Sequence, residues 1–244
     1  MLNVVYWVRG EDYAELAVCS AKTMKRVYDG AKVIIYADQE WPVFEGDPVD
    51  EVICLPIQNT MPHMIANIHC QVHYVVNNSF DRITLFCDAD VLAIKKAPLD
   101  SLAEYDLIVT KRDHVKLDKD GEKVVGVARQ MPYNYGVVFA NPVMGAREIF
   151  IWMRERVVKM GSHLQDWFGN QWALRELVGG SMDEETPREV KRTMAWGSVS
   201  IKIEDCSMWN YLPHGDEPIN DKYFVHVKGG DKERFYSIAK ELAA

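Results

Sequence analysis

Short apolar runs alternate with amphipathic stretches along the first ninety residues of the chain. The runs are rich in β-branched and aromatic residues and are separated by turn-forming residues, a pattern typical of β-strands. They cover residues 2–8, 32–37, 51–55 and 82–90. Apolar side chains recur at helical spacing in residues 13–28 and 65–76. Strands that alternate with helices predict a parallel sheet with helices on its faces.

The rest of the chain has a mixed pattern. Further strands are expected at residues 105–110, 123–127, 132–142, 199–203 and 223–227. Helices are expected at residues 145–160, 166–178 and in the C-terminal segment with Phe235, Ile238 and Leu242 on one face. Polar stretches are interpreted as a hairpin turn at 118–121 and as loops at 39–50 and 181–195. We therefore expect one α/β domain with a mixed, mainly parallel central sheet flanked by helices.

Two aspartates end the strand predicted at residues 82–90. Asp88 and Asp90 are separated by one small residue, Ala89, and side chains alternate along a strand, so both carboxylates project to the same side. Ligands of parallel α/β sheets bind at the carboxyl ends of the strands. Paired carboxylates suit a divalent cation such as Mg²⁺ or Mn²⁺. An isolated Asp-x-Asp also occurs as a simple charged loop, so the rest of the chain decides between the two interpretations.

A second group of polar residues follows the last predicted strand. His226 ends this strand, Gly229 and Gly230 follow, and Lys232 precedes the final helix. Backbone N–H groups at a helix start, together with a lysine, form a cradle for phosphate. On its own the segment is better interpreted as a glycine-rich start of a helix with a solvated lysine. Together with the two aspartates, it predicts a diphosphate site.

The first predicted turn lacks two common nucleotide-binding motifs. Neither the Gly-x-Gly-x-x-Gly fingerprint nor the phosphate loop of many kinases is present, which removes the usual dehydrogenase and ATPase mechanisms. Trp7, Val8 and Tyr13 flank the turn and are candidate contacts of a nucleotide, although aromatic residues near a strand end are often core residues. His69 and His73 are four residues apart but lack a third zinc ligand of matching spacing, so a core or interface pair is the preferred interpretation.

Composition excludes some classes of partner and compartment. The 244 residues are 48% hydrophobic, which supports a single domain with a substantial core. A net charge of −8 makes nucleic acid an unlikely partner. The five cysteines show no Cys-x-x-Cys spacing and are expected to be reduced thiols. The chain starts directly with a strand-like run and has no apolar stretch long enough to cross a bilayer, so we expect a cytoplasmic protein with no transmembrane segment.

Several motifs together resemble a known enzyme family. Asp88-Ala89-Asp90 resembles the Asp-x-Asp motif of nucleotide-sugar-dependent glycosyltransferases with the GT-A fold, a Rossmann-like α/β fold. Five further segments, in the same order and with similar spacing, resemble the retaining family 8 group that includes glycogenin and bacterial galactosyltransferases. They are Asp12-Tyr13 with the following helix, Ile68-His69-Cys70, Asn134-Tyr135-Gly136-Val137 with Pro142, Gly169 to Leu174, and Asn210 to Pro213 followed by His226-x-x-Gly229-x-x-Lys232.

The resemblance implies a metal site and a diphosphate site. Asp88, Asp90 and His226 would hold Mn²⁺ or Mg²⁺, and an imidazole ligand among carboxylates favours Mn²⁺. Gly229 and Lys232 would contact the diphosphate of a sugar nucleotide, and a UDP-sugar is the expected donor. The cation and the lysine would stabilise the negative charge that develops when the glycosidic bond to the diphosphate breaks.

The resemblance also implies residues that face the sugar, with some departures from the family pattern. Asn134, Asn170 and Gln171 would lie beside the sugar and the reacting carbon. The family usually has aspartate where this chain has Asn170, and Asp166, one turn earlier, is a further candidate catalytic residue. Asn67 stands where many members have lysine.

The expected function is transfer of a sugar from a nucleotide donor to a hydroxyl acceptor, with retention of the anomeric configuration favoured. Residues 1–90 would form the nucleotide-binding half, and residues 91–244 would bind the sugar and the acceptor. One alternative is a sugar-phosphate nucleotidyltransferase, against which stands the lack of a glycine-rich, lysine-containing loop in the first turn. The other is a non-catalytic module in which the two aspartates hold a structural cation. The acceptor could be a glycan, a protein or a small molecule.

Overall fold

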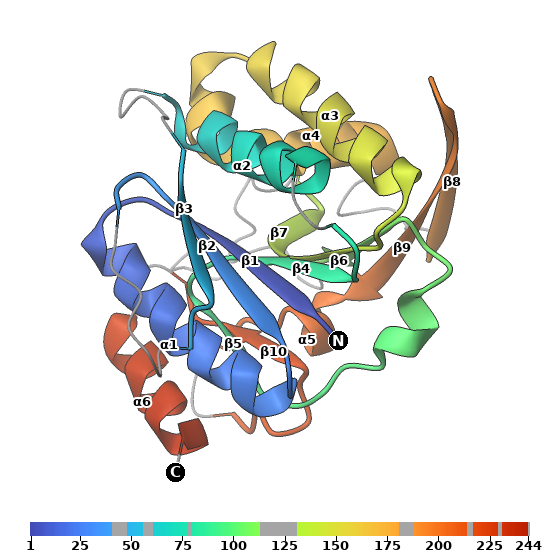
Figure 1. The fold of residues 1–244 in the computed structure, drawn as a ribbon. Helices are drawn as coiled ribbons and strands as arrows, with labels where there is room; N and C mark the ends of the chain where they lie inside the picture. The colour runs from blue at the N-terminus through green and yellow to red at the C-terminus, as the bar shows by residue number, and fades with distance from the viewer. Residues whose placement is uncertain are drawn as a thin grey trace, which may run out of the picture.

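A mixed sheet of eight strands runs through the middle of the molecule (Figure 1). In this computed structural model the order across the sheet is β3-β2-β1-β4-β7-β6-β9-β8. The strands are β1 (Asn3–Val8), β2 (Lys32–Ala37), β3 (Glu51–Cys54), β4 (Thr84–Cys87), β6 (Leu107–Lys111), β7 (Tyr133–Ala140), β8 (Glu189–Met194) and β9 (Gly197–Asp205). A smaller two-stranded sheet pairs β5 (Val91–Ala93) with β10 (Phe224–His226). The structure describes residues 1–40, 48–55, 61–77, 80–112, 131–180, 188–213, 217–228 and 231–243.

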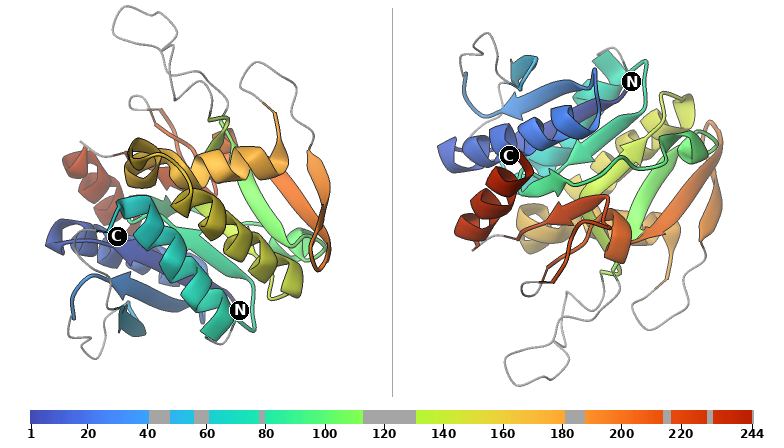
Figure 2. Two further views of the ribbon diagram at one scale, coloured as in Figure 1. Left: turned by 90° about the horizontal axis from the view of Figure 1, so that it is seen from above. Right: turned by 90° about the horizontal axis from the view of Figure 1, so that it is seen from below.

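Helices cover both faces of the central sheet (Figure 2). On one face lie α2 (His63–Asn77), α3 (Met144–Val158) and α4 (Gly169–Val178), and on the other lie α1 (Glu11–Val27), α6 (Lys232–Ala243) and the small sheet. Three short segments complete the described elements: the single turn α5 (Cys206–Trp209), the 3₁₀ turn η1 (Leu99–Leu102) and the π-helical turn η3 (Leu164–Phe168). The predicted α/β class with a mixed central sheet is therefore confirmed. No helix in the described ranges is both long enough and apolar enough to cross a membrane.

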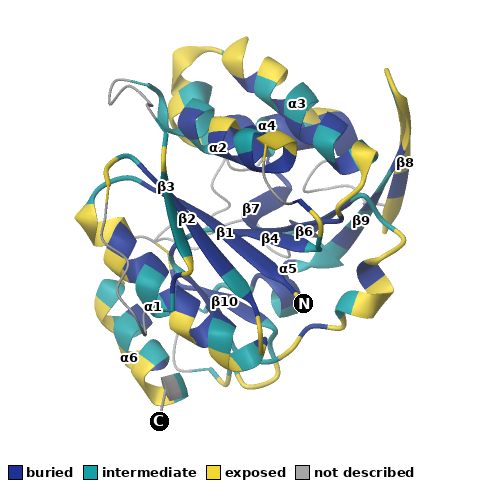
Figure 3. Cartoon of the chain, in the orientation of Figure 1, coloured by how far each residue is buried: buried dark blue, intermediate teal, exposed yellow. Residues whose placement is uncertain are grey.

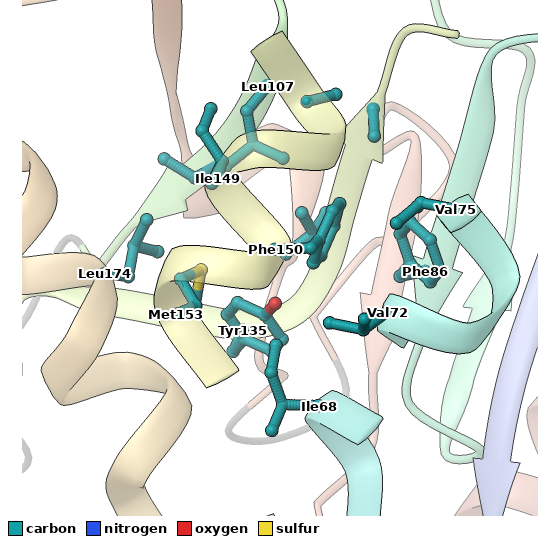
Figure 4. Close-up of a cluster of buried hydrophobic side chains, with 14 of the residues drawn as sticks. Ile68, Val72, Val75, Phe86, Leu107, Tyr135, Ile149, Phe150, Met153 and Leu174 are labelled. Carbon is teal, nitrogen blue, oxygen red and sulfur yellow. The ribbon is translucent and has the colours of Figure 1, made fainter. Parts of the chain in front are cut away.

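Each face of the sheet has its own apolar core. The core under α2, α3 and α4 contains Phe86 of β4 and Phe150 of α3, whose ring centroids lie 4.8 Å apart (Figure 4). The core on the opposite face contains Phe139 of β7 and Phe224 of β10, with centroids 5.7 Å apart. Because side chains alternate along each strand, one strand supplies both cores, and the central strands are buried along their whole length (Figure 3).

Strands β1 to β4 form the parallel region of the sheet that the alternation of strands and helices predicts. β2 and β4 both pair in parallel with β1, and β3 pairs in parallel with β2. The carboxyl ends of these strands therefore lie along one edge of the sheet, with Trp7 of β1 level with Asp88 after β4. Beyond β4 the order departs from simple alternation, because β7 is inserted antiparallel between β4 and β6.

Two expectations for the second half are wrong. Part of the segment 181–195 forms β8, which pairs with β9 as an antiparallel hairpin at the edge of the sheet. Its residues are mostly exposed on both faces, which explains why a polar, charged sequence can form a strand there (Figure 3). The helix expected at 166–178 is two elements, a π-helical turn η3 (Leu164–Phe168) and then α4. The hairpin expected at 118–127 lies outside the described residues.

Candidate metal centre and its surroundings

Two carboxylates and one imidazole meet at the carboxyl end of β4. Asp88 and Asp90 follow β4 directly, and His226 is the last residue of β10. β10 pairs with β5 so that His226 lies opposite Val91. The Nε2 atom of His226 is 3.1 Å from Oδ1 of Asp90 and 3.8 Å from Oδ2 of Asp88. Three residues that are far apart in sequence thus place one ligand atom each within 4.8 Å of one another.

Helix α1 holds the short strand β5, and through it the histidine, against the main sheet. The hydroxyl of Thr23 accepts a hydrogen bond of 2.9 Å from the backbone N–H of Ala93. The hydroxyl of Ser20 donates to the carbonyl of Val91. Both side chains are buried, so these bonds join α1 to β5 without competition from water.

A directional chain of hydrogen bonds sets the tautomer of His226. A backbone carbonyl can only accept, so the hydroxyl of Thr110 must donate to the carbonyl of Asn134 at 2.9 Å. That hydroxyl then accepts from Nδ2 of Asn210 at 3.1 Å, which turns Oδ1 of Asn210 toward Nδ1 of His226 at 3.0 Å. Nδ1 therefore carries the proton and donates it to Asn210. The Nε2 atom is left with a bare lone pair that faces the two carboxylates.

A glycine makes room for this arrangement. A Cβ atom on Gly136 would lie 2.5 Å from Cε1 of His226 and 2.9 Å from Oδ2 of Asp88, both too close for any side chain. The carbonyl of Gly136 also accepts a hydrogen bond of 3.0 Å from the N–H of Asp88. The pairing of β7 with β6 is irregular near this position. Ile108 pairs with Phe139 and Thr110 pairs with Asn134, so β7 has extra residues between the two pairs.

The electrostatics of the pair favour a cation. Burial raises the pKa of Asp88 above its ordinary value and Asp90 adds to the rise, whereas His226 and Lys228 act in the opposite direction. The thiol of Cys87 is buried, and burial together with the two carboxylates raises its pKa well above the usual range, so it stays protonated and inert. Two carboxylates and an imidazole with a bare nitrogen fit a divalent cation such as Mn²⁺ or Mg²⁺.

Solved structures of known proteins share this architecture. The galactosyltransferase LgtC, in complex with donor and acceptor sugar analogues, has a TM-score of 0.57 at 14% identity, over 99% of this chain and 96% of its own. A glycosyltransferase involved in the glycosylation of the major capsid of PBCV-1 has a TM-score of 0.58 at 9% identity, over 98% of both chains. The glycosyltransferase GlyE of Streptococcus pneumoniae TIGR4 has a TM-score of 0.57 at 14% identity, over 99% of this chain and 59% of its own.

The chain has the GT-A fold. These likenesses confirm the predicted fold over nearly the whole chain. No protein-family model matches the sequence, and no curated protein matches it.

In this GT-A fold, Trp7 lies next to the candidate metal centre. Trp7 and Asp88 line a small pocket together with Asn67 and Gln71 of α2. The ring of Trp7 is largely buried, lies 6.3 Å from the ring of His63 and has no described hydrogen-bond partner for its Nε1 atom. An indole whose N–H lacks a partner at the edge of the site is suited to contact a ligand there.

The other residues expected at the nucleotide are placed differently. The side chains of Val8 and Ala89 are buried in the core on the α1 face, so only their backbone atoms remain for a ligand. Tyr13 is 47% exposed on α1 and is accessible. Lys232 forms an exposed ion pair of 2.7 Å with Asp12, which joins the start of α6 to α1. Gly229 lies outside the described residues.

Three amide side chains expected at the sugar lie on β7 and α4. Asn134 is 2% exposed, and its Oδ1 accepts from the N–H of Gly136 at 3.2 Å while its Nδ2 has no partner among the described residues. Asn170 is 1% exposed, and neither of its amide atoms has a hydrogen-bond partner in the described part of the chain. Oε1 of Gln171 accepts from Nη2 of Arg112 at 2.8 Å.

Asp166 does not share the environment of Asn170. It lies on the exposed π-helical turn η3, whereas Asn170 is buried in the first turn of α4. Asp166 acts electrostatically on His63 at the start of α2, where it opposes the lowering of the pKa of His63 by burial and by Arg9. Because a π-helical turn is wider than an α-helical one, the four-residue spacing does not place the two side chains on one face.

Sequence reasoning did not identify the residues that support the metal centre. Thr110 ends a predicted strand, and no motif in the sequence indicates a role for it. Asn210 belongs to a segment that resembles the family, but the resemblance assigns it no contact with His226. The hydroxyl of Tyr135 donates a hydrogen bond of 2.9 Å to Oε1 of Gln71 in the pocket that Asp88 also lines. This bond joins β7 to α2, and no local sequence pattern predicts it. Their roles depend on contacts across the sheet rather than on spacing along the chain.

Proposed function

We propose that the chain is a glycosyltransferase of the family 8 type that moves a sugar from a nucleotide donor to a hydroxyl acceptor with the help of a divalent cation. The observation that carries the proposal is the meeting of Asp88, Asp90 and His226 at the carboxyl end of β4 in a GT-A fold. Ligands of parallel α/β sheets bind at this edge. The expected donor is a UDP-sugar.

The metal ligands are two carboxylate oxygens and the bare nitrogen of His226. Asp88, Asp90 and Nε2 of His226 would hold Mn²⁺ or Mg²⁺, and the imidazole favours Mn²⁺. When bound, such a cation stabilises the charge that develops on a diphosphate leaving group. We assign nucleotide binding to residues 1–90 and binding of the sugar and acceptor to residues 91–244. Lys232 would leave Asp12 and contact the diphosphate, together with the backbone at Gly229.

The amide groups around the site are proposed to orient the sugar. Asn134, Asn170 and Gln171 offer donors and acceptors that match the hydroxyl groups of a sugar ring. The two amide atoms of Asn170 that lack described partners support this role, because buried polar groups normally have partners. Trp7 and Tyr13 would border the nucleotide. Retention of the anomeric configuration is the proposed outcome, and NMR spectroscopy of the first product formed would establish it.

A thermal-shift screen of nucleotide sugars with and without Mn²⁺ tests the proposal. We expect one donor to raise the melting temperature only when Mn²⁺ is present. Asp90→Ala should abolish this shift and also metal-dependent hydrolysis and transfer of the donor sugar. Asp81→Ala, which changes an exposed aspartate at the other end of β4, is the matched control and should leave all three unchanged.

Three results would contradict the proposal. Turnover that is unchanged in Asp90→Ala would show that the cluster has no part in the reaction. Binding of Mn²⁺ without any metal-dependent affinity for a nucleotide would instead support a module with a structural cation. Release of pyrophosphate from UTP in the presence of a sugar phosphate would indicate nucleotidyl transfer.

A further inference from the structure

Helices α1 and α6 lie side by side on one face of the central sheet and run in the same direction (Figure 1). Near their starts, Nζ of Lys232 forms an ion pair of 2.7 Å with Oδ2 of Asp12. Near their ends, Nη1 of Arg26 donates to the carbonyl of Leu242 at 2.5 Å. The two helices are therefore joined at both ends of their contact.

A pocket of about 460 Å³ lies between the two helices. The stretch of α1 from Cys19 to Arg26 advances about 10 Å along the helix axis, so the pocket is longer than a single helical turn. Pockets that bind small molecules typically measure about 300–1,000 Å³, and this one falls within that range. Its described lining comes from both helices: Cys19, Lys22, Thr23 and Arg26 of α1, and Tyr236, Ala239, Lys240 and Leu242 of α6.

The wall of this pocket is mostly apolar. Tyr236, Ala239 and Leu242 are partly buried side chains that pack against the core on this face of the sheet. The hydroxyl of Thr23 donates to a backbone carbonyl at 2.8 Å and accepts from a backbone N–H at 2.9 Å. Its hydrogen-bonding capacity is thus used within the protein, and an occupant would meet apolar surface along the wall.

Three cations line the same pocket. Lys22, Arg26 and Lys240 are exposed, and none of them forms an ion pair with a carboxylate in the part of the chain that the structure describes. The described hydrogen bonds of the Arg26 guanidinium group all go to backbone carbonyls, which are neutral. No acidic side chain is among the described lining residues. The pocket therefore combines an apolar wall with uncompensated positive charge.

The helix ends alone do not explain where these cations lie. Basic side chains in the last turn of a helix stabilise its C-terminus whichever face they occupy. Lys25, Arg26 and Lys240 are in such last turns. Lys25 pairs with Asp50 at 2.6 Å and does not line the pocket, whereas Arg26 and Lys240 do. Lys22 lies a full turn before Arg26 and lines the pocket as well.

We propose that the pocket between α1 and α6 binds a small amphipathic carboxylate in free solution, an unbranched acyl chain with one anionic head group. The long apolar wall matches a linear chain, which would remove apolar surface from water on both sides. The head group would pair with Lys22, Arg26 and Lys240, because lysine and arginine both form charge-assisted hydrogen bonds with carboxylates. Charge and shape of the pocket thus indicate the same class of ligand.

This pocket is distinct from the candidate metal centre. Among the described residues, its lining does not include Asp88, Asp90 or His226. The amphipathic carboxylate is therefore a ligand beyond the proposed glycosyl transfer, and its binding should need neither Mn²⁺ nor UDP. Failure of the proposed transfer would leave this site in place, and failure of this site would leave the proposed transfer in place.

Calorimetric titration of the full chain with three probes tests the proposal. Decanoate has both the chain and the carboxylate, decyltrimethylammonium has the same chain with the opposite charge, and acetate has the charge without the chain. We expect decanoate to bind. Decyltrimethylammonium should bind about tenfold more weakly or worse, because the three cations repel it. Acetate should bind about a hundredfold more weakly or worse, because it buries almost no apolar surface.

Variants of the lining locate the site. Ala239→Trp places a large ring in the pocket and should abolish binding of decanoate. Lys22→Met and Lys240→Met each remove one exposed charge and should weaken binding by about threefold, as expected for an exposed ion pair. Lys159→Met is the matched control, because Lys159 is an exposed lysine at the end of α3 on the opposite face of the sheet. Melting temperatures identify any variant that fails to fold.

Alkylation by iodoacetamide provides a second measurement on the unmodified chain. Cys19 lines the pocket and is partly exposed, whereas Cys54 is exposed on β3 and does not line it. We expect decanoate at ten times its dissociation constant to slow alkylation of Cys19 by about tenfold. Alkylation of Cys54, followed by mass spectrometry of peptides in the same samples, should be unchanged.

The proposed site is wrong if decanoate does not bind, or if decyltrimethylammonium binds as tightly as decanoate. It is also wrong if decanoate binds Ala239→Trp as tightly as the wild-type chain, or if it leaves the alkylation of Cys19 unchanged, because the ligand then lies elsewhere. Binding to vesicles of an anionic phospholipid without any binding of decanoate would indicate a membrane surface as the partner and would overturn the proposal as well.

Discussion

The metal side and the sugar side of the candidate site differ in how far the fold has satisfied their polar groups. On the metal side, His226, Asn210 and Thr110 form a chain of hydrogen bonds that ends on a backbone carbonyl. On the sugar side, the amide group of Asn170 is buried and has no hydrogen-bond partner within the described residues. The candidate metal ligands are thus positioned by the fold itself, whereas the proposed sugar side has a buried amide group without a described partner.

This difference has an energetic meaning. A buried polar group without a partner costs about 1–3 kcal/mol. Asn170 therefore destabilises the free protein, and a sugar hydroxyl that bonds to it would offset the cost. The metal side needs no such rearrangement, because the orientation of His226 is already set by Asn210. We therefore expect substitutions on the metal side to lower the affinity for the metal ion. Substitution of Asn170 on the sugar side should instead change the free energy of unfolding.

Gly136→Ala should have the largest effect on the metal side. The new Cβ atom would collide with the imidazole of His226 and with Asp88, so one of the two ligands must move. We expect the affinity for Mn²⁺, measured by electron paramagnetic resonance, to fall by about a hundredfold. Gly161→Ala is the matched control, because its nearest neighbour is at an ordinary contact distance of 3.5 Å. Equal affinity in the two variants would show that the cluster does not bind the ion.

Asn210→Leu should have the next largest effect. The leucine has a similar size but cannot accept the proton of Nδ1, so the imidazole loses its fixed tautomer and orientation. We expect the affinity for Mn²⁺ to fall by about tenfold or more, the usual range for the loss of such a partner. An affinity equal to that of the wild-type protein would contradict the assigned hydrogen-bond direction.

Thr110→Val tests the same chain one bond further away and should have a smaller effect. Valine keeps the shape of threonine but removes the hydroxyl group, so the amide of Asn210 is no longer held in one orientation. We expect a loss in affinity for Mn²⁺ of about threefold to tenfold. Thr193→Val, at an exposed position of β8, is the control. A loss as large as that of Asn210→Leu would show that Thr110 supports the site in some further way.

Asn170→Leu should give the smallest effect on metal binding and an opposite effect on stability. It removes a buried amide that has no described partner, so we expect the free energy of unfolding to rise by about 1 kcal/mol. Affinity for Mn²⁺ should stay unchanged while turnover with the donor sugar falls. Denaturant unfolding of Asn170→Leu and of Asn210→Leu compares the free energy of unfolding after a change on the sugar side with that after a change on the metal side. Destabilisation of both would mean that the two sides of the site do not differ.

The sequence was most informative about the parallel strands β1 to β4 and about the residues of the candidate metal centre. Strands and helices alternate there in chain order, so each apolar run could be assigned from its own residues, as β1 and β2 show. Asp88 and Asp90 follow the carboxyl end of β4, at the edge of the sheet where ligands bind, and His226 ends β10 of the small sheet. The sequence pattern and the topology of the sheet therefore indicate the same site.

The rest could not be read from the sequence, because it depends on which strands become neighbours. β7 passes between β4 and β6 and brings Gly136 to Asp88. β9 pairs with β6 and leads into α5, which brings Asn210 to Thr110. β8 lies in a segment whose polar sequence predicts a loop, because an edge strand does not need an apolar face. Asp166 is one helical turn before Asn170 in the sequence, but it lies within the π-helical turn η3, which the sequence pattern did not indicate.

The most direct test of the account is a calorimetric titration of UDP into the wild-type chain and into Asp90→Asn, each with and without Mn²⁺. The account predicts that Mn²⁺ raises the affinity of the wild-type chain for UDP by at least about tenfold and has no such effect on Asp90→Asn, which keeps the shape of the side chain but loses its charge. An affinity for UDP that is the same in all four titrations would contradict the central claim that this cluster holds a cation for a nucleotide diphosphate.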